Sequence, residues 1–326
     1  MAIYYLNVKT LGRGAGARAT SAAAYRAGER IRDERTGAVF DHSKRTDVMD
    51  KEIVLPSKFS ATDMSWIRDR STLWNAAEGA ERRKNACVAR EYLVALPYEI
   101  TQVQRLHLVQ RFSQELADRH GFAVDFVIHA PRPNNDPRNY HAHLLTTTRE
   151  ISPTGLGAKT GLDIRGSERR ARGLGSYLDE LLAVRQQWAT LTNDALRQAN
   201  VEARVDHRSL AAQGIDREPT PRLPEGARRT EERGQRSEIA EEIRAAYRTR
   251  VQARLERATA RATTVEIAGG LDEIRKRARQ SWLQLRRAEL EGFATKAPAP
   301  EHNQSHSDAQ QERDPHSTGP EDDLAM

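Results

Sequence analysis

Apolar and polar residues follow two different periods over the first part of the chain. Short apolar runs, some of them alternating residue by residue, predict β-strands, because alternate residues of a strand face opposite sides of a sheet. These runs cover residues 3–8, 52–56, 87–97, 122–130 and 141–148. Apolar residues at helical spacing predict helices over residues 21–31, 64–83, 101–120 and 177–200. Thr20 or Ser21 would cap the first helix, and Thr101 would cap the third.

The order of these elements predicts an α+β fold, with an antiparallel sheet and helices packed on one side of it. Residues 131–139 read PRPNNDPRN and consist almost entirely of turn formers. We therefore expect the strands on either side of this segment to form a hairpin.

The composition of the chain changes after residue 150. Residues 152–176 are rich in glycine and arginine and are expected to form a mobile loop. Arg, Glu and Ala dominate from about residue 222, which predicts charged helices over 230–292. The final residues offer nothing apolar to bury and are expected to be disordered. The sequence thus predicts a globular domain over 1–220, a charged helical extension over 221–295 and a disordered tail over 296–326.

Composition and charge narrow the class of protein. The formal net charge of +6 and the pI near 9.5 favour a polyanionic partner, with nucleic acid as the leading candidate. No apolar run approaches the roughly 18 residues that a membrane span needs, and the start MAIYYLNVKT lacks the features of a signal peptide. The single cysteine, Cys87, excludes an intramolecular disulfide framework and fits a reducing compartment. We therefore expect a cytoplasmic protein without membrane insertion.

Three histidines are expected to meet at one end of the predicted hairpin. His141 and His143 are two residues apart on a strand and share a face, and His129 ends the preceding strand. Three imidazoles with open coordination positions suit Mn²⁺, Zn²⁺, Ni²⁺ or Co²⁺. Asp125 shares the alternation of His129 and could orient a ligand through a hydrogen bond. A packed histidine pair is the alternative.

These residues alone leave the reaction open among nuclease, hydrolase, cupin-like and phosphodiesterase chemistry. Tyr25 stands in TSAAAYRAGERI, where small neighbours let a helix approach a sheet while one large polar side chain projects. A tyrosine on a helix is equally a core residue with its hydroxyl at the edge. The local sequence therefore does not decide its role.

Several longer motifs, found in order, are more specific. They are MAIYYLNVKT, SAAAYRAGERIRDERTG, EIVLP, LWNAAEGAERRKNACVAREYLVALPYEIT and NYHAHLLTTTR within residues 1–150, and VDHRSLAAQGID at 205–216. Together they resemble the MobA/MobL family of plasmid conjugative relaxases, the MobQ class. The resemblance implies a fold similar to that of rolling-circle replication initiators, with a metal site built on a His-hydrophobic-His pair.

The resemblance also implies a reaction. A tyrosine hydroxyl attacks the scissile phosphate at the nic site of a plasmid origin of transfer, forms a 5′-phosphotyrosine link and frees a 3′-OH; the reverse reaction reseals the strand. Tyr25 occupies the nucleophile position, and Glu91 matches an acidic residue near the site. The metal-ligand positions are occupied by His129, His141 and His143. The implied cofactor is a divalent metal, Mn²⁺ or Mg²⁺ in the first place, with Zn²⁺, Ni²⁺ or Co²⁺ as alternatives.

The chemistry of the residue types agrees with this reaction. A phenol is a poor nucleophile at neutral pH and needs a base or a nearby cation. A metal held by three neutral histidines keeps its charge and can polarise a phosphate. Glu91 could accept the tyrosine proton or orient a ligand. The chain contains no GxxxxGK[ST] P-loop and so shows no motor of its own.

The implied partners are single-stranded or supercoiled origin-of-transfer DNA, relaxosome accessory proteins and the coupling protein of a type IV secretion channel. The protein would pass into the recipient cell linked to the transferred strand. Basic residues near the predicted nucleophile and in the 152–176 loop are predicted phosphate contacts, with a solvated charged surface as the alternative. They are Arg13, Arg18, Arg26, Lys44, Arg45, Lys159 and Arg165.

Two other functions remain open from the sequence. A rolling-circle replication initiator of similar fold would share the histidine pair and the tyrosine. A non-catalytic, DNA-binding plasmid accessory protein would need neither the tyrosine nor the metal site.

Overall fold

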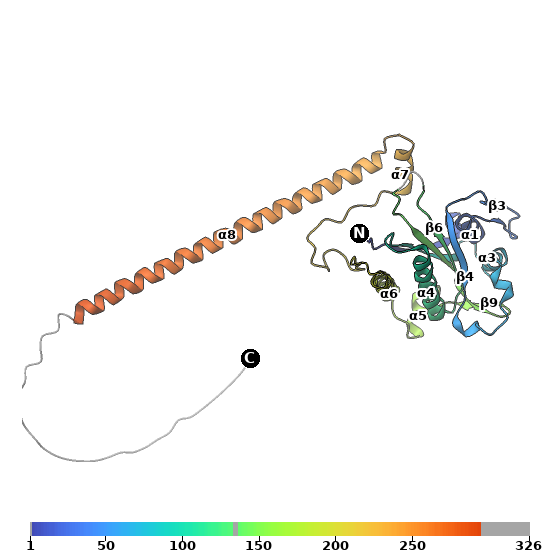
Figure 1. Cartoon of the computed structure of the whole chain (residues 1–326), viewed down its shortest axis with the longest axis horizontal. Helices are drawn as coiled ribbons and strands as arrows, with labels where there is room; N and C mark the ends of the chain where they lie inside the picture. Colours follow the sequence, from blue (N-terminus) through green and yellow to red (C-terminus); the bar gives the residue numbers. More distant parts are fainter. Residues whose placement is uncertain (1, 133–135, 295–326) are drawn as a thin grey trace, which may run out of the picture. The chain divides into compact units, whose positions relative to one another are not determined.

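The computed structural model describes residues 2–132 and 136–294, which fall into two compact units, Met1–Arg217 and Glu218–Met326. A five-stranded sheet in the order β1-β5-β7-β6-β4 forms the centre of the first unit (Figure 1). Every neighbouring pair of these strands is antiparallel, as predicted. The strands are β1 (Leu6–Gly12), β4 (Val48–Val54), β5 (Cys87–Ala95), β6 (Val124–His129) and β7 (His141–Thr146).

Helices cover both faces of the sheet. Adjacent residues of a strand point to opposite faces, so Leu144 and Leu145 enter two different cores. Leu144 shares a core with Phe112 and Trp188 of α4 and α6, whereas Leu145 shares one with Trp74 of α3. The prediction of helices on one side was therefore wrong. The helices of this unit are α1 (Ala19–Ala27), α2 (Ser65–Arg68), α3 (Arg70–Gly79), α4 (Gln102–His120), α5 (Gly166–Ala171) and α6 (Tyr177–Gln198).

The bounds of α1 differ from the prediction at both ends. The helix begins at Ala19 after Arg18, with no side-chain cap, so the prediction of a cap at Thr20 or Ser21 was wrong. It ends at Ala27 because Gly28 adopts the left-handed conformation, with φ of 61°. The residues that follow form β2 (Arg30–Arg32), which pairs with β3 (Val39–Asp41).

The helix predicted over 64–83 is two helices. Asp69 has an extended backbone, with ψ of 118°, and its carboxylate accepts a hydrogen bond from the Thr72 amide, so it ends α2 and caps α3. By contrast, α4 has the predicted threonine cap, in which Thr101 and Gln104 form a reciprocal capping box.

The segment predicted as a loop over 152–176 is partly ordered. It contains part of the hairpin of β8 (Arg149–Ser152) and β9 (Gly155–Lys159), followed by α5. Buried Leu162 and Ile164 lie in this segment. Short 3-10 helices at Arg13–Ala15 and Ser57–Phe59 complete the first unit.

The described part of the second unit contains α7 (Glu225–Glu232) and the 57-residue helix α8 (Glu238–Ala294). Their charges pair within and between helices, as in the Arg244–Glu231 ion pair at 2.5 Å. The predicted disordered tail, 296–326, lies outside the described residues. No helix among the residues that the structure describes is long and apolar enough to cross a membrane.

Candidate metal centre and nucleophile

The β6–β7 hairpin brings three histidines together. Its register sets His129 directly opposite His141, and His143 lies two residues further along the same face. The ring centroids are 5.3 Å apart for His129 and His141, 5.0 Å for His129 and His143, and 5.3 Å for His141 and His143. One ring nitrogen of each imidazole lies within 4.8 Å of the other two. The predicted convergence of the three imidazoles is therefore confirmed.

Each of these imidazoles has one ring nitrogen in a hydrogen bond with an oxygen. His129 Nε2 lies 2.7 Å from the Arg26 carbonyl, and His141 Nδ1 lies 3.1 Å from the Asn139 carbonyl. His143 Nδ1 lies 2.7 Å from Glu91 Oε1. Because these oxygens accept, the bonded nitrogen carries the proton and the second ring nitrogen keeps its lone pair. This donor set fits a divalent cation.

Burial keeps the histidines neutral. Desolvation lowers the pKa of His129 from 6.5 to about 3, more than its bond to the Arg26 carbonyl raises it. Desolvation also lowers the pKa of His141 and of His143. Metal ligation requires the neutral imidazole, so the environment favours the ligating form.

Glu91 is a fully buried carboxylate on β5, next to the histidines. It bonds to His143, to Arg26 and, at 2.8 Å, to Lys9. Burial would raise its pKa, but the hydrogen bonds from His143 and Arg26 outweigh burial and hold the pKa well below its usual range. Glu91 is therefore an anion that fixes the orientation of His143.

Tyr25 lies in the last turn of α1 and is 42% exposed. Arg132 Nη2 donates a hydrogen bond to its hydroxyl oxygen at 3.0 Å. The Arg45 guanidinium carbon lies 4.4 Å from the ring centroid, and the His42 ring meets the tyrosine ring edge-on at 5.2 Å. The next residue, Arg26, connects the helix to the histidines through both its carbonyl and its guanidinium.

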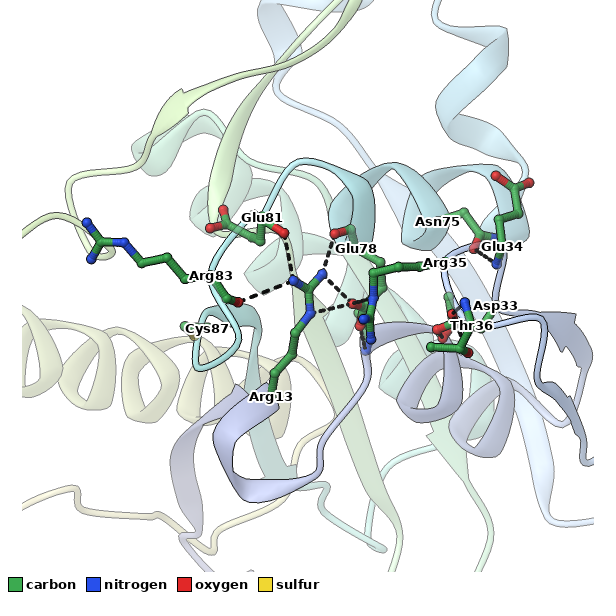
Figure 2. Close-up of polar contacts among 12 residues, drawn as sticks. Arg13, Asp33, Glu34, Arg35, Thr36, Asn75, Glu78, Glu81, Arg83 and Cys87 are labelled. Atoms are coloured by element: carbon green, nitrogen blue, oxygen red, sulfur yellow. Dashed lines mark hydrogen bonds and ion pairs between the residues drawn. The ribbon is translucent and has the colours of Figure 1, made fainter.

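The start of α1 is fixed by a buried ion pair (Figure 2). Glu78 Oε1 accepts a hydrogen bond from the Ala19 amide at 2.7 Å, while Glu78 Oε2 pairs with Arg13 at 2.6 Å. Arg13 also donates to the carbonyl of Glu81 at 2.6 Å. Figure 2 shows the guanidinium of Arg13 directed at the end of α3. Arg13 therefore joins the start of α1 to α3, and its contact with DNA stays a prediction.

Asp125 has a different role from the one predicted. Its two carboxylate oxygens accept hydrogen bonds at 2.8 Å from Arg70 and from the Trp74 indole. Asp125 and His129 share a face, but four residues of strand separate them by about 13 Å. Asp125 and Glu91 both lie opposite Leu145 in the sheet, but the Asp125 carboxylate accepts from Arg70 and Trp74 of the helix layer. The Glu91 carboxylate bonds to His143 instead.

Several basic residues predicted to contact DNA lie beside carboxylates. These pairs are Arg13–Glu78, Arg26–Glu91, Arg45–Asp47 and Lys159–Glu81. The guanidinium of Arg18 lies 5.8 Å from the centroid of the Phe40 ring. Lys44 and Arg165 are exposed, and their contact with DNA stays a prediction.

Arg132, Asp47 and Lys9 were not among the predicted site residues. Arg132 could have been predicted, since it lies three residues after His129 in the turn of the predicted hairpin. Asp47 and Lys9 carried none, because only the pairing of β4 with β6 and of β1 with β5 brings them to the site.

An antiparallel sheet with a three-histidine cluster, and a tyrosine helix bonded to it, agrees with the family that the sequence resembles. The chain belongs to the MobA/MobL family, whose profile matches residues 18–233.

Individual relatives carry names from mobilisation. Mobilization protein MobL of Acidithiobacillus ferridurans is 36% identical over an alignment of 261 residues, and the match covers 72% of this chain and 66% of that protein. Probable mobilization protein MobA of Bifidobacterium longum is 34% identical over an alignment of 269 residues, and the match covers 73% of this chain and 46% of that protein. The chain thus spans less than two thirds of the length of either relative.

A solved structure from a study of the molecular basis of vancomycin resistance transfer in Staphylococcus aureus has a similar fold. It is 27% identical with a TM-score of 0.53, and the match covers 64% of this chain and 100% of that chain.

Proposed function

We propose that this chain is a mobilisation relaxase that cuts one strand of plasmid DNA at an origin of transfer and later reseals it. The observation that carries the proposal is the position of Arg26. This residue follows Tyr25 and bonds to His129 through its carbonyl and to Glu91, the partner of His143, through its guanidinium. A candidate nucleophile and a candidate metal site are thereby held together. The mobilization names of the relatives support the same role.

In the proposed reaction, the Tyr25 oxygen attacks the scissile phosphorus. A new bond forms between that oxygen and phosphorus, and the bond to the 3′ oxygen of the preceding nucleotide breaks. The phenol gives up its proton, the departing oxygen takes one up, and the products are a 5′-phosphotyrosine and a free 3′-OH. The ester keeps the energy of the broken bond, so the reverse attack reseals the strand without a nucleotide cofactor.

The exposure of Tyr25 suits a substrate as large as DNA. Its side chain is 42% exposed at the end of α1, so a phosphodiester can approach the hydroxyl without opening the core. The helix itself is held at both ends, by Glu78 at Ala19 and by Arg26 at His129. A fixed helix lowers the entropy lost when the nucleophile meets its phosphate.

His129, His141 and His143 would hold a divalent metal, Mn²⁺ or Mg²⁺ in the first place. Such an ion would supply positive charge for the scissile phosphate. Glu91 orients His143 in this scheme and is no general base. Its hydrogen bonds from His143 and Arg26 hold its pKa well below the usual range, which makes it a weak base, and its oxygens already bond to His143, Arg26 and Lys9.

The wider setting follows from the same proposal. The substrate is plasmid DNA at an origin of transfer, and the partners are relaxosome accessory proteins and a type IV coupling protein. The protein would work in the bacterial cytoplasm and pass into the recipient on the 5′ end of the strand.

The test is a covalent adduct. The chain is incubated with Mn²⁺ and a supercoiled plasmid that carries DNA flanking its own gene, and detergent-stable protein–DNA adducts are resolved on a denaturing gel. We expect an adduct with the wild type and none with Tyr25→Phe. Tyr98→Phe is the matched control, because Tyr98 is also 42% exposed, and it should behave as the wild type.

Three outcomes would contradict the proposal. An adduct with Tyr25→Phe would show that another residue is the nucleophile. DNA binding without any adduct would favour a non-catalytic accessory protein, and an adduct confined to a replication origin would favour a replication initiator.

A further inference from the structure

We propose that two arginines outside the histidine cluster act on the nucleophile: Arg132 stabilises negative charge on the Tyr25 oxygen, and Arg45 holds the tyrosine ring in place. This inference rests on the proposed role of Tyr25 and adds to it the source of its activation.

Activation of Tyr25 needs a group other than Glu91. Glu91 is buried, and its carboxylate oxygens are already occupied by Lys9, Arg26 and His143. The hydroxyl of Tyr25 instead receives a hydrogen bond from Arg132 Nη2 at 3.0 Å. A cation that donates to an oxygen favours the form of that oxygen that carries negative charge.

Arg132 is placed for this task by the β6–β7 connection. It lies three residues after His129, the last residue of β6, so one short segment carries both a histidine of the cluster and the donor to Tyr25. Arginine stays protonated at every pH that an enzyme uses, so the donor would be available throughout. The hydrogen bond to a phenolate is stronger than the bond to a phenol, and this difference would lower the barrier to attack.

Arg45 fixes the ring from another side. Its guanidinium carbon lies 4.4 Å from the Tyr25 ring centroid, and Nη1 donates to the Tyr25 carbonyl at 2.6 Å. Its Nε and Nη2 form a two-pronged pair with Asp47, at 2.8 and 2.5 Å. Three fixed contacts leave the guanidinium little freedom, so Arg45 is a positioning residue.

Asp47 joins the two arginines. Its carboxylate binds Arg45 directly and lies 3.9 Å from Arg132 Nε, while its carbonyl accepts a hydrogen bond from the Ala130 amide at 2.8 Å. Asp47 and the two arginines are thereby attached to Ala130, the residue that follows His129. His42, edge-on to the Tyr25 ring at 5.2 Å, completes the set of charged or titratable groups that we place beside the nucleophile.

The experiment measures adduct formation by full-length variants. The probe is a single-stranded DNA library with a randomised centre and a label at the 3′ end, incubated with Mn²⁺, and rates are taken at about pH 7 and about pH 9. Arg132→Gln should lower the rate about tenfold to a hundredfold near pH 7, the loss of one charge-assisted hydrogen bond, and should recover most of it near pH 9. Arg132→Lys should retain part of the rate.

Arg138→Gln is the matched control, because it removes the same charge from the same connection, at a residue paired with Asp136 at 2.7 Å. It should behave as the wild type. Fluorescence anisotropy with the uncleaved library should give Arg132→Gln an affinity within about twofold of this control. A loss that is equal at both pH values and comes with weaker binding would make Arg132 a phosphate contact and overturn the inference.

Arg45 is tested with Arg45→Lys, which keeps the charge but loses the planar fork. We expect a rate about tenfold lower at both pH values, with thermal stability within the range of the other variants. A wild-type rate for Arg45→Lys would overturn its role.

The inference and the proposed function can fail separately. If a Tyr25-dependent adduct forms and Arg132→Gln matches the control, only the inference is wrong. If the wild type forms no adduct, or Tyr25→Phe forms one, the proposed function fails and the inference falls with it.

Discussion

The carbonyl of Arg26 accepts a hydrogen bond of 2.7 Å from His129 Nε2. One peptide therefore connects the end of α1, where Tyr25 lies, to the end of β6, where the histidine cluster begins. The contact also sets the tautomer of His129, because a carbonyl can only accept. Residues more than a hundred positions apart in the chain are thus fixed relative to one another.

Glu91 is expected to control metal affinity through His143. Glu91→Gln removes the anion that holds Nδ1 of His143 in its protonated form, at 2.7 Å. We expect the affinity for Mn²⁺ to fall about tenfold or more in calorimetric titration. Glu52→Gln is the control, since Glu52 is an exposed glutamate on β4 that bonds to Gln110. Equal Mn²⁺ affinities for the two variants would show that Glu91 does not influence metal binding.

Asp125 is expected to contribute to stability and not to metal affinity. It is 2% exposed and bonds to Arg70 and Trp74, so Asp125→Asn should lower the free energy of unfolding by about 2–3 kcal/mol in urea. Its Mn²⁺ affinity should stay within about twofold of the wild type. A large loss of affinity with unchanged stability would restore the role that the sequence first indicated for Asp125.

The metal-free protein is expected to lose stability as the pH falls. The pKa of His129 is lowered from 6.5 to about 3 by burial, so below about pH 6.5 the unfolded chain takes up a proton that the folded chain excludes. Stability is therefore fully present above pH 6.5 and falls toward pH 3, by about 2 kcal/mol between pH 6.5 and pH 5 for this one group.

Urea denaturation of the metal-free chain at several pH values measures how steeply the free energy of unfolding changes with pH. His129→Asn keeps an N–H donor for the Arg26 carbonyl but removes the titrating ring, so its slope should be shallower. Identical slopes for the variant and the wild type would mean that His129 is protonated in the folded state.

Glu78 is expected to matter for the nucleophile helix. Its side chain is 1% exposed and accepts bonds from the Ala19 amide and Arg13. Glu78→Gln leaves a buried arginine without its carboxylate and should cost about 3 kcal/mol of unfolding free energy. Glu150→Gln, at an exposed position, should cost nothing measurable. Similar losses for both would show that the ion pair of Arg13 and Glu78 contributes little.

The histidine cluster could be predicted from the sequence because it depends on local rules. Strand alternation gives His141 and His143 one face, and the turn formers after His129 close the hairpin. The same alternation misled the prediction for Asp125, because it gives the face of a residue and not the partners that a helix brings to that face, here Arg70 and Trp74 of α3.

Partners from distant strands and helices could not be predicted. Arg13 and Arg26 look like surface charges in the sequence, and their partners Glu78 and Glu91 lie 65 positions further along the chain. The glycines and arginines of residues 152–176 likewise led to the prediction of a mobile loop. The apolar residues Leu162 and Ile164, which are buried, could have indicated an ordered segment. The break at Asp69 was readable in principle, since Asp and Thr three residues apart form an N-cap.

The most direct test of the account locates the covalent bond. The protein–DNA adduct is digested with nuclease and protease, and the peptide that carries the remaining nucleotide is sequenced by mass spectrometry. The account predicts a phosphodiester on the oxygen of Tyr25, in the peptide that also contains Arg26. A nucleotide on any other residue, for example on Tyr4 or Tyr5 near the start of the chain, would contradict the account.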